Sequence, residues 1–281
     1  MDKEAMKQPA QEWEFRSKPT WQRLIIMLGG VIMNVVLAFV IYIGMLSIYG
    51  EQYLPTAEAN KYGIATDSLA REFGLRNGDR ILAVDGHYIE DFNKIPLTLI
   101  LEEAKTIDIE RDGKKTTLTL PAGAIGKLVK HKSPLFISVR IPFVVESFPE
   151  NSAARDAGLL PGDSLLGINN QDIRYFQDFR EAIQAYKGQE VSIQVKRAAD
   201  TLSFGMTVPE AGFIGVYPRQ QMDAFFHLNQ KDFSIAEAIP AGMVKTVDGI
   251  GGYLKQLKLL FSPEVKAYEN VGGFITIGSI F

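Results

Sequence analysis

The same pattern of residues occurs twice in this chain, 84 positions apart. The first copy reads GLRNGDRILAVDGHYI at residues 74–89, and the second reads GLLPGDSLLGINNQDI at residues 158–173. A match in register over such a span indicates one small domain duplicated in tandem. With 281 residues, the chain has room for about two domains of ordinary size.

Each copy predicts the same order of elements. A strand comes first, then a short helical turn that ends in Gly, then a strand after the Gly-Asp turn. A second, amphipathic helix follows, with Ile95 and Leu99 in the first copy and Phe179 and Ile183 in the second. Two paired strands close each unit, at residues 107–110 with 116–120 and at residues 191–195 with 201–208. This order predicts two small, partly open β-barrels, at residues 61–140 and 141–218. Almost no linker separates them, so we expect a fixed pair.

Residues 24–49 form a run of 26 residues without a charge. At a rise of 1.5 Å per residue, a helix of this length spans about 39 Å, more than the ~30 Å hydrocarbon core of a bilayer. A signal peptide fits poorly, because the apolar run is too long and no small-x-small cleavage site follows it. Arg16, Lys18 and Arg23 precede the run and Glu51 follows it, so residues 1–23 are expected to be cytoplasmic and the repeats to lie outside.

One polar residue, Asn34, interrupts the predicted transmembrane helix, and Gly30 lies one turn before it. Inside a bilayer an amide needs a partner, because no water is available. The pair is explained equally well by a helix–helix packing position and by an intramembrane functional site.

The last part of the chain predicts an amphipathic helix at residues 234–261. Its apolar residues recur at steps of three and four, and its five charges argue against a lipid-embedded span. We expect it on the membrane surface or braced against other helices, and burial in a soluble core is the alternative. Residues 262–281 are expected to begin a further membrane segment. Together these elements predict an α+β multidomain membrane protein.

Charge and composition exclude several classes of site. The 30 basic and 33 acidic side chains are nearly balanced, so no nucleic-acid partner is expected. The chain has no cysteine, which excludes disulfides and thiolate metal sites. No two of the three histidines, His87, His131 and His227, lie close enough in sequence to form a ligand pair, so no metal ligand is predicted.

The repeated core G-L-x-x-G-D-x-(I/L)-L-x-(V/I) resembles that of PDZ domains of the circularly permuted bacterial kind. The resemblance implies that a peptide adds a strand beside the second helix and that loop amides receive its terminal carboxylate. The residues that match this role are Leu135, Phe136 and Ile137 in the first copy, and Phe179, Ile183, Gly212, Phe213, Ile214 and Gly215 in the second. We favour the second groove, because two glycines allow unusual backbone angles there. A strand-entry glycine without a ligand remains the alternative for each copy.

The whole order, from WQRLIIMLGGVIMN to NVGGFITIGSIF, resembles the middle of bacterial site-2-type intramembrane zinc metalloproteases of the RseP group. The resemblance implies that Gly30 and Asn34 position the unwound segment of a transmembrane substrate. It also implies that the PDZ pair is a size filter outside the inner membrane, in the periplasmic or extracellular space. Expected substrates are anti-sigma-factor-like proteins or signal-peptide remnants, cleaved in regulated intramembrane proteolysis.

The sequence departs from that family at the metal. The family binds zinc through H-E-x-x-H and L-D-G motifs, and neither occurs here. We therefore expect no catalytic residue and no zinc ligand in this chain, which reads as a fragment that is inactive alone. A membrane-anchored tandem PDZ adaptor for envelope quality control or secretion is the alternative function. A trypsin-like protease with PDZ domains is excluded, because no double barrel with a Ser/His/Asp set is present.

Overall fold

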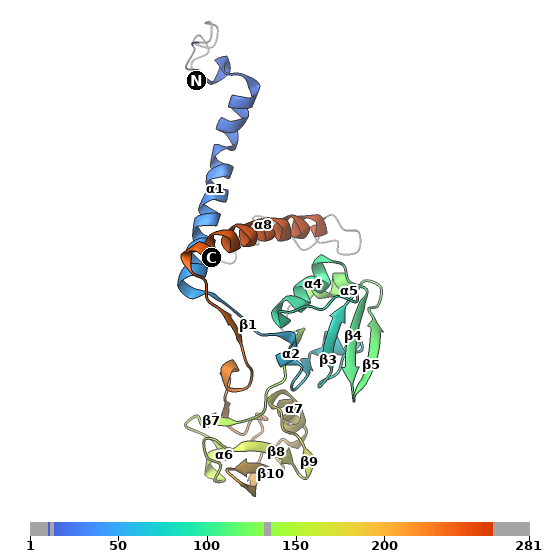
Figure 1. Cartoon of the computed structure of the whole chain (residues 1–281). Coiled ribbons are helices and arrows are strands. Elements are labelled where there is room, and N and C mark those ends of the chain that lie inside the picture. Colours follow the sequence, from blue (N-terminus) through green and yellow to red (C-terminus); the bar gives the residue numbers. More distant parts are fainter. Residues whose placement is uncertain (1–10, 12–13, 132–135, 261–281) are drawn as a thin grey trace. The chain divides into compact units, whose positions relative to one another are not determined.

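A computed structural model describes residues 11, 14–131 and 136–260 of the chain (Figure 1). Two compact units are distinguished. The first comprises residues 1–51 and 230–254, and the second comprises residues 52–229 and 255–281. The predicted segment 262–281 and Leu135 lie outside the described residues.

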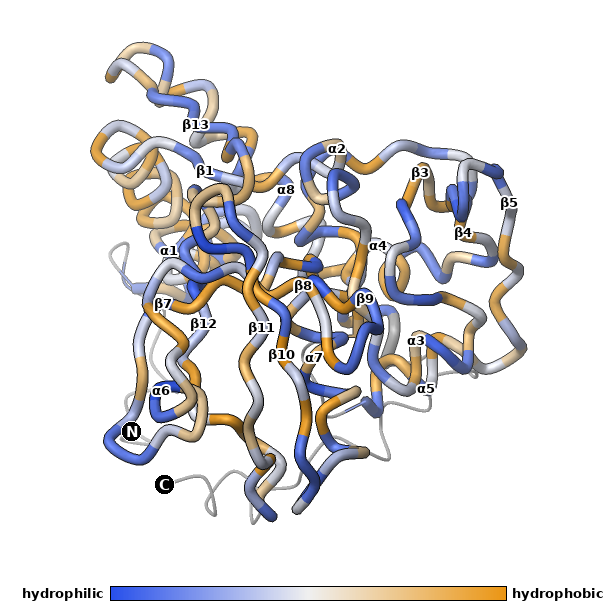
Figure 2. The backbone as a smooth tube through the Cα atoms, turned by 90° about the horizontal axis from the view of Figure 1, so that it is seen from below, coloured by the Kyte–Doolittle hydropathy of each residue, from blue (hydrophilic) through white to orange (hydrophobic). Residues whose placement is uncertain are grey.

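The helix α1 runs from Thr20 to Tyr49 and therefore starts four residues before the predicted span. Among the described residues it is the one helix that is long and apolar enough to cross a membrane, with a mean hydropathy of 2.8 in its most apolar window. None of that window is buried, and its coil is drawn largely in the hydrophobic colours of Figure 2. The helix is capped by Gly50, whose φ of 68° a residue with a side chain rarely adopts.

The helix α8 runs from Ile235 to Leu260. Its start is a capping box, in which Ser234 N donates to Glu237 Oε2 at 2.9 Å and Glu237 N donates to Ser234 Oγ at 3.4 Å. Gly242 lies against α1, because a Cβ there would come within 2.9 Å of the Ile43 backbone nitrogen. The predicted apolar stripe is exposed at Ile239, Met243, Val247, Ile250 and Leu254, and the buried stripe consists of Ala238, Gly242 and Thr246. Thus α8 approaches α1 closely at Gly242, a residue without a side chain.

The two repeats share the order strand, helix, strand, helix and three strands, and each has further short elements of its own. The first contains β2 (Ile64–Thr66), α3 (Ser68–Glu72), β3 (Arg80–Val84), η3 (Phe92–Lys94), α4 (Ile95–Leu101), β4 (Thr106–Arg111), β5 (Lys114–Thr119), α5 (Ala124–Lys130) and β6 (Ile137–Val139). The second contains β7 (Val145–Ser147), α6 (Ala153–Asp156), β8 (Ser164–Ile168), β9 (Gln171–Asp172), α7 (Phe176–Ala182), η4 (Ile183–Tyr186), β10 (Glu190–Arg197), β11 (Asp200–Thr207) and β12 (Tyr217–Pro218). Short elements flank them, namely η2 (Phe15–Ser17), β1 (Glu51–Tyr53), α2 (Thr56–Ala59), η5 (Met222–Ala224) and β13 (Asn229–Lys231).

The sheets of the repeats are built alike. In the first repeat β3, β4 and β5 form an antiparallel sheet and β2 pairs with β6. In the second repeat the order is β11-β10-β8-β9, and β7 pairs with β12. The strand β1 pairs with β13.

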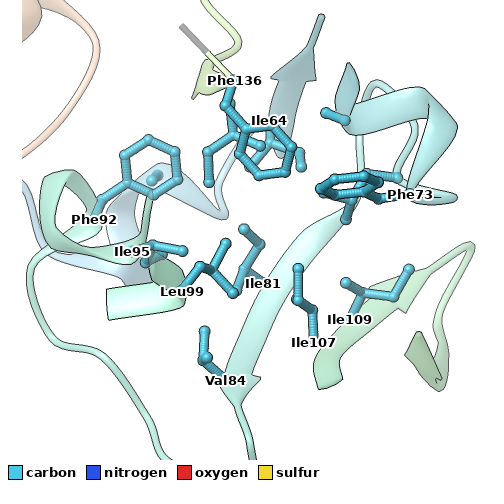
Figure 3. Packing of buried hydrophobic residues seen from close by; sticks show 14 of the residues in the cluster. Ile64, Phe73, Ile81, Val84, Phe92, Ile95, Leu99, Ile107, Ile109 and Phe136 are labelled. Carbon is cyan, nitrogen blue, oxygen red and sulfur yellow. The ribbon is translucent and has the colours of Figure 1, made fainter. Parts of the chain in front are cut away.

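The core of the first repeat lies between its helices and its sheet (Figure 3). Ile95 and Leu99 of α4 face Ile81 of β3 and Ile107 of β4, and all four side chains are almost completely buried. The same core includes residues beyond the predicted domain 61–140, namely Leu54, Ala59, Ile141, Phe225 and Phe226. The first repeat is therefore completed by segments on both sides of the tandem.

A buried carboxylate holds the Gly-Asp turn in both repeats. Asp79 accepts two hydrogen bonds from Arg111, at 2.7 and 2.8 Å, and Asp163 accepts two from Arg197, both at 2.7 Å. Each carboxylate also accepts from the backbone N–H three residues earlier, and each arginine donates to the carbonyl oxygen of the glycine that ends the preceding helix. Bidentate pairs of this kind are among the strongest hydrogen bonds in proteins. Each copy therefore contains an equivalent Asp–Arg pair, called the clamp below.

The connector between the repeats is itself hydrogen bonded. Phe143 N donates to Arg174 O at 2.8 Å, and Phe176 N donates to Ile141 O at 3.0 Å. Pro142 and Tyr175 form an antiparallel bridge between these bonds. The connector is thus paired with the residues that lead into α7.

Candidate functional site

The second repeat contains an apolar cavity of about 400 Å³ between α7 with η4 on one side and residues 212–217 on the other. Its lining consists of Phe143, Pro149, Phe176, Phe179, Arg180, Ile183, Gly212, Phe213, Ile214, Gly215, Val216 and Tyr217. This set, called the second groove below, includes all six residues that the sequence predicts for peptide contact in the second copy. The structure brings them together around one space.

The helical wall of the second groove rests on two residues one turn apart. Phe179 and Ile183 are 3% and 1% exposed and lie on one face of α7 and η4. The ring of Phe143 packs edge-on against the rings of Phe179 and Phe176, with centroids 4.9 Å and 5.2 Å apart. The wall is therefore anchored in the core of the second repeat and offers a mainly apolar surface.

The opposite wall is a loop with two glycines in left-handed conformations. Gly212 has a φ of 76° and Gly215 a φ of 75°, as their sequence pattern predicts. Ser152 Oγ donates to Gly215 O at 2.6 Å, and a Cβ on Gly215 would lie 2.8 Å from Ser152 Cα. Gln184 Nε2 donates to Gly212 O at 2.8 Å, which ties the loop to η4. Because glycine has no side chain, the loop packs closely on its own repeat at these two positions.

The loop presents unused backbone donors. In the part of the chain that the structure describes, the N–H groups of Phe213, Ile214 and Gly215 donate no hydrogen bond. Phe213 is 61% exposed and Tyr217 is 56% exposed, so both rings remain accessible at the groove. Arg180 adds an exposed positive charge to the lining. Adjacent N–H groups beside an apolar cavity suit an extended peptide with a terminal carboxylate.

The first repeat differs at Phe136, which matches the exposed Phe213 of the second repeat, whereas Ile137 is buried like Ile214. Phe136 and Ile137 are 3% and 5% exposed and belong to its core, where the Phe136 ring lies 5.7 Å from that of Phe73 (Figure 3). Any contact of these two residues with a peptide is therefore left to their backbone. The sequence alone did not distinguish this inward orientation from a groove lining.

The two residues singled out in α1 lie on an open face of the helix. The side chain of Asn34 is exposed, and no described residue forms a hydrogen bond with it. No heavy atom lies within 4 Å of the position that a Cβ on Gly30 would take. The helix therefore leaves room for another backbone beside Asn34.

A metal site does not fit the described residues. No group of three His, Cys, Asp or Glu side chains among them could hold a metal ion. His131 pairs with Asp67, and His87 Nδ1 lies 3.0 Å from the carbonyl oxygen of Asp85. We therefore derive no catalytic step through zinc from this chain.

Comparison with known proteins assigns the family. The model of "Peptidase family M50" matches residues 2–279. The regulator of sigma-E protease RseP of Escherichia coli K12 is 26% identical over 73% of this chain and 49% of its own length. The regulator of sigma E protease of Haemophilus influenzae is 24% identical over 94% of this chain and 61% of its own. A protein of Neisseria meningitidis serogroup A named "Putative zinc metalloprotease" is 25% identical over 92% of this chain and 61% of its own.

The chain thus spans about three fifths of the length of two of these relatives. Among solved structures, the PDZ domain of the SdrC-like protein of Listeria monocytogenes is 23% identical and covers 31% of this chain and 94% of its own, with a TM-score of 0.25. The relatives and the apolar helix α1 support an inner-membrane protein. With a family model that matches residues 2–279, the chain belongs to peptidase family M50, in the RseP group of site-2-type zinc metalloproteases.

Proposed function

We propose that this chain is the substrate-gating portion of a membrane-embedded zinc metalloprotease that performs regulated intramembrane proteolysis. The observation that carries the proposal is the M50 match over residues 2–279, which includes α1 and both repeats. The substrates we propose are transmembrane proteins of the anti-sigma-factor kind or signal-peptide remnants. The name of the Escherichia coli relative, a regulator of sigma-E protease, supports the first of these.

In this proposal the repeats are a tandem of circularly permuted PDZ domains. Their shared order of elements supports it, and so does the position of the second groove between α7 and the loop that leads into β12. The second groove takes the C-terminal end of a peptide whose last side chain is apolar. Three unused N–H groups receive its carboxylate, and the aromatic lining receives its side chain.

The proposed arrangement in the membrane follows from charge and apolarity. The helix α1 crosses the inner membrane with its N-terminal end in the cytoplasm, because Arg16, Lys18 and Arg23 lie at that end. The repeats then lie on the periplasmic side. The exposed apolar stripe of α8 lies along the membrane surface.

The proposal predicts that Asn34 matters for cleavage. In the whole gene product that carries this chain, Asn34→Leu is expected to slow cleavage of a membrane-embedded substrate by about tenfold or more, the effect of one lost hydrogen bond to substrate. Ser47→Ala is the control, because the Ser47 hydroxyl donates to Gly44 O within α1 at 3.0 Å. Cleavage is measured by the rate at which a tagged substrate is shortened in cells. Equal rates for wild type and Asn34→Leu would remove the intramembrane role of Asn34.

A second prediction concerns the groove. Phe213→Ser is expected to weaken binding of a peptide with an apolar C-terminal residue by about tenfold, because the exposed ring lines the cavity. Leu160→Ser is the matched control, since Leu160 is 50% exposed in the same repeat and does not line the cavity. Fluorescence anisotropy of a labelled peptide measures the affinity. If both variants bind like the wild type, Phe213 does not contact the peptide.

Gating is tested with one substrate in two lengths. The whole gene product is expected to cleave a membrane substrate after its extramembrane domain has been removed, and to spare the intact form. Deleting residues 61–218 should abolish this difference and leave cleavage in place. A protein that binds both forms and cleaves neither would instead be an adaptor, the alternative that the tandem repeats alone also allow.

A further inference from the structure

The helical wall of the second groove is shared with the first repeat. We propose that Asp178 of α7 is a positioning residue, through which docking of the first repeat sets the second groove, so that docking and peptide binding are coupled. The inference rests on the peptide binding proposed above. It assigns the first repeat a role in a groove that it does not line.

The helix α7 has two working faces. Phe176 and Phe179 face the cavity, and Gln177 and Asp178 face the first repeat. Gln177 Nε2 donates to Val139 O at 3.0 Å, at the end of β6. Because both faces belong to one short helix, a displacement of the residues on one face also displaces those on the other.

Asp178 is the centre of the contact. Its Oδ1 accepts from Asn77 Nδ2 at 2.7 Å, and its Oδ2 accepts from Arg140 Nε at 2.9 Å and also from Arg140 Nη2. The side chains of Arg140 and Asp178 are only 20% and 19% exposed. The Arg140 guanidinium lies 3.8 Å from the centroid of the Tyr175 ring. A partly buried carboxylate with three donors from the other repeat is well placed to hold α7.

The contact continues into the frame of the first repeat. Asn77 belongs to the Gly-Asp turn, and its Oδ1 accepts from the Thr66 N and Oγ1 atoms, both at 2.8 Å. One amide therefore joins β2, the turn and α7. On the other side, the connector bonds from Ile141 and Phe143 hold the residues before α7. The first turn of α7 is thus held from two sides.

A second ion pair across the same boundary is less suited to this role. Arg71 and Glu181 are 45% and 52% exposed. Exposed pairs contribute little, because water and salt screen them. Asp178 rather than Glu181 therefore carries the coupling.

Coupling has to act in both directions. If docking of the first repeat favours the peptide-binding form of α7, bound peptide must favour docking by the same factor. A peptide in the second groove would then make the tandem stiffer. This coupling requires no direct contact between the peptide and the first repeat.

The test uses the whole chain in lipid nanodiscs and a short fluorescent peptide that ends in Leu-Val with a free carboxylate. Asp178→Ala and Arg140→Met are expected to weaken binding by about tenfold, within the usual range of coupling between sites. Arg219→Met is the matched control. Arg219 follows the last strand of the second repeat as Arg140 follows that of the first, and each backbone N–H donates to the carbonyl oxygen of the residue before the first strand of its repeat. Arg219, however, pairs with Glu146, and this pair is largely exposed. Its affinity is expected to stay within twofold of wild type.

The docking of the two repeats is measured in a separate experiment. The chain has no cysteine, so one spin label at Lys115→Cys and one at Lys196→Cys report the distance between the repeats. The distance distribution should broaden in Arg140→Met and narrow when peptide saturates the wild type. A purely structural role of Asp178 would lower the stability of the second repeat without any effect of peptide on this distance.

The outcomes separate the two proposals. If the wild type does not bind the peptide, both the groove function and the coupling are overturned. If the wild type binds and both variants bind as tightly as Arg219→Met, only the coupling is overturned. Should Asp178→Ala fail to fold, Arg140→Met decides, because it leaves α7 itself unchanged.

Discussion

Replacing Arg111 with methionine is expected to lower the free energy of unfolding of the first repeat by about 3 kcal/mol, since it strands a buried charge. The side chain of Asp79 is completely buried, and its two bonds from Arg111 would be lost at once. The hydrogen bond from Arg111 to the carbonyl oxygen of Gly74, at 2.7 Å, would be lost as well. Urea unfolding, followed with a fluorophore on a cysteine introduced into the first repeat, measures the change.

The control for this variant lies in the same sheet. Arg80 pairs with Glu110 at 2.8 Å, and the Arg80 side chain is 49% exposed. Arg80→Met is therefore expected to cost less than about 1 kcal/mol. If the two arginine variants are equally stable, the buried clamp does not stabilise the repeat.

The clamp of the second repeat is expected to make stability depend on pH. Burial acts to raise the pKa of Asp163, but hydrogen bonds from Arg197 and from the Leu160 N–H outweigh it, and the pKa lies below its ordinary value. A lowered pKa contributes stability above the unfolded-state value of about 3.9, and this contribution is lost as the pH falls through the folded-state pKa. Wild type should therefore lose stability below about pH 4, and Asp163→Asn should show a flatter profile there.

Gly215→Ala is expected to cost about 2 kcal/mol or more in stability and to weaken peptide binding by tenfold or more. A side chain at a φ of 75° is strained, and its Cβ would lie 2.8 Å from Ser152 Cα and 3.1 Å from Asn151 O. Relief requires the loop to move away from α6. That movement breaks the bonds from Ser152 Oγ to Gly215 O and from Ala154 N to Ile214 O.

Gly205→Ala in β11 is the matched control for this change. Its Cβ would meet only Glu190 Oε1, at 3.8 Å, and its φ is not left-handed. It should leave both stability and affinity near those of wild type. The role of Gly215 would be refuted by a Gly215→Ala variant that binds peptide as tightly as Gly205→Ala.

The sequence predicted those parts of the fold that local chemistry controls. Asp112 and Gly113, an Asp-Gly pair typical of tight hairpins, both adopt positive φ, 51° and 74°, between β4 and β5. The helices α4, α7 and α8 lie where their apolar spacing places them. The helix α5 was missed, because Gly126 weakens its helical pattern; its residues Ala124, Ile125 and Leu128 are buried in the core of the first repeat.

Long-range contacts left little trace in the sequence. The residues Asp79 and Asp163 obey the repeat register, but Arg111 and Arg197 do not, so the duplication does not reveal the clamps. Phe225 joins the first core from beyond the second repeat, and no periodicity marks it. At the site, the six residues that the resemblance names in the second copy line one cavity, and their contact with a peptide stays a prediction. Asp178 was not predictable, since a charge on the polar face of a helix looks the same whether it meets water or a neighbouring domain.

The hydrogen-bonded connector at residues 140–143 has a mechanical consequence. Two modules on a slack tether sample many separations, and a filter built from them would grade substrates gradually by bulk. Here the connector is hydrogen bonded to the second repeat, which restricts the range of separations between the two repeats. In the proposed size filter, such a connection would give a sharp limit on substrate size, and inserting a few Gly-Ser pairs after Arg140 is expected to make that limit gradual.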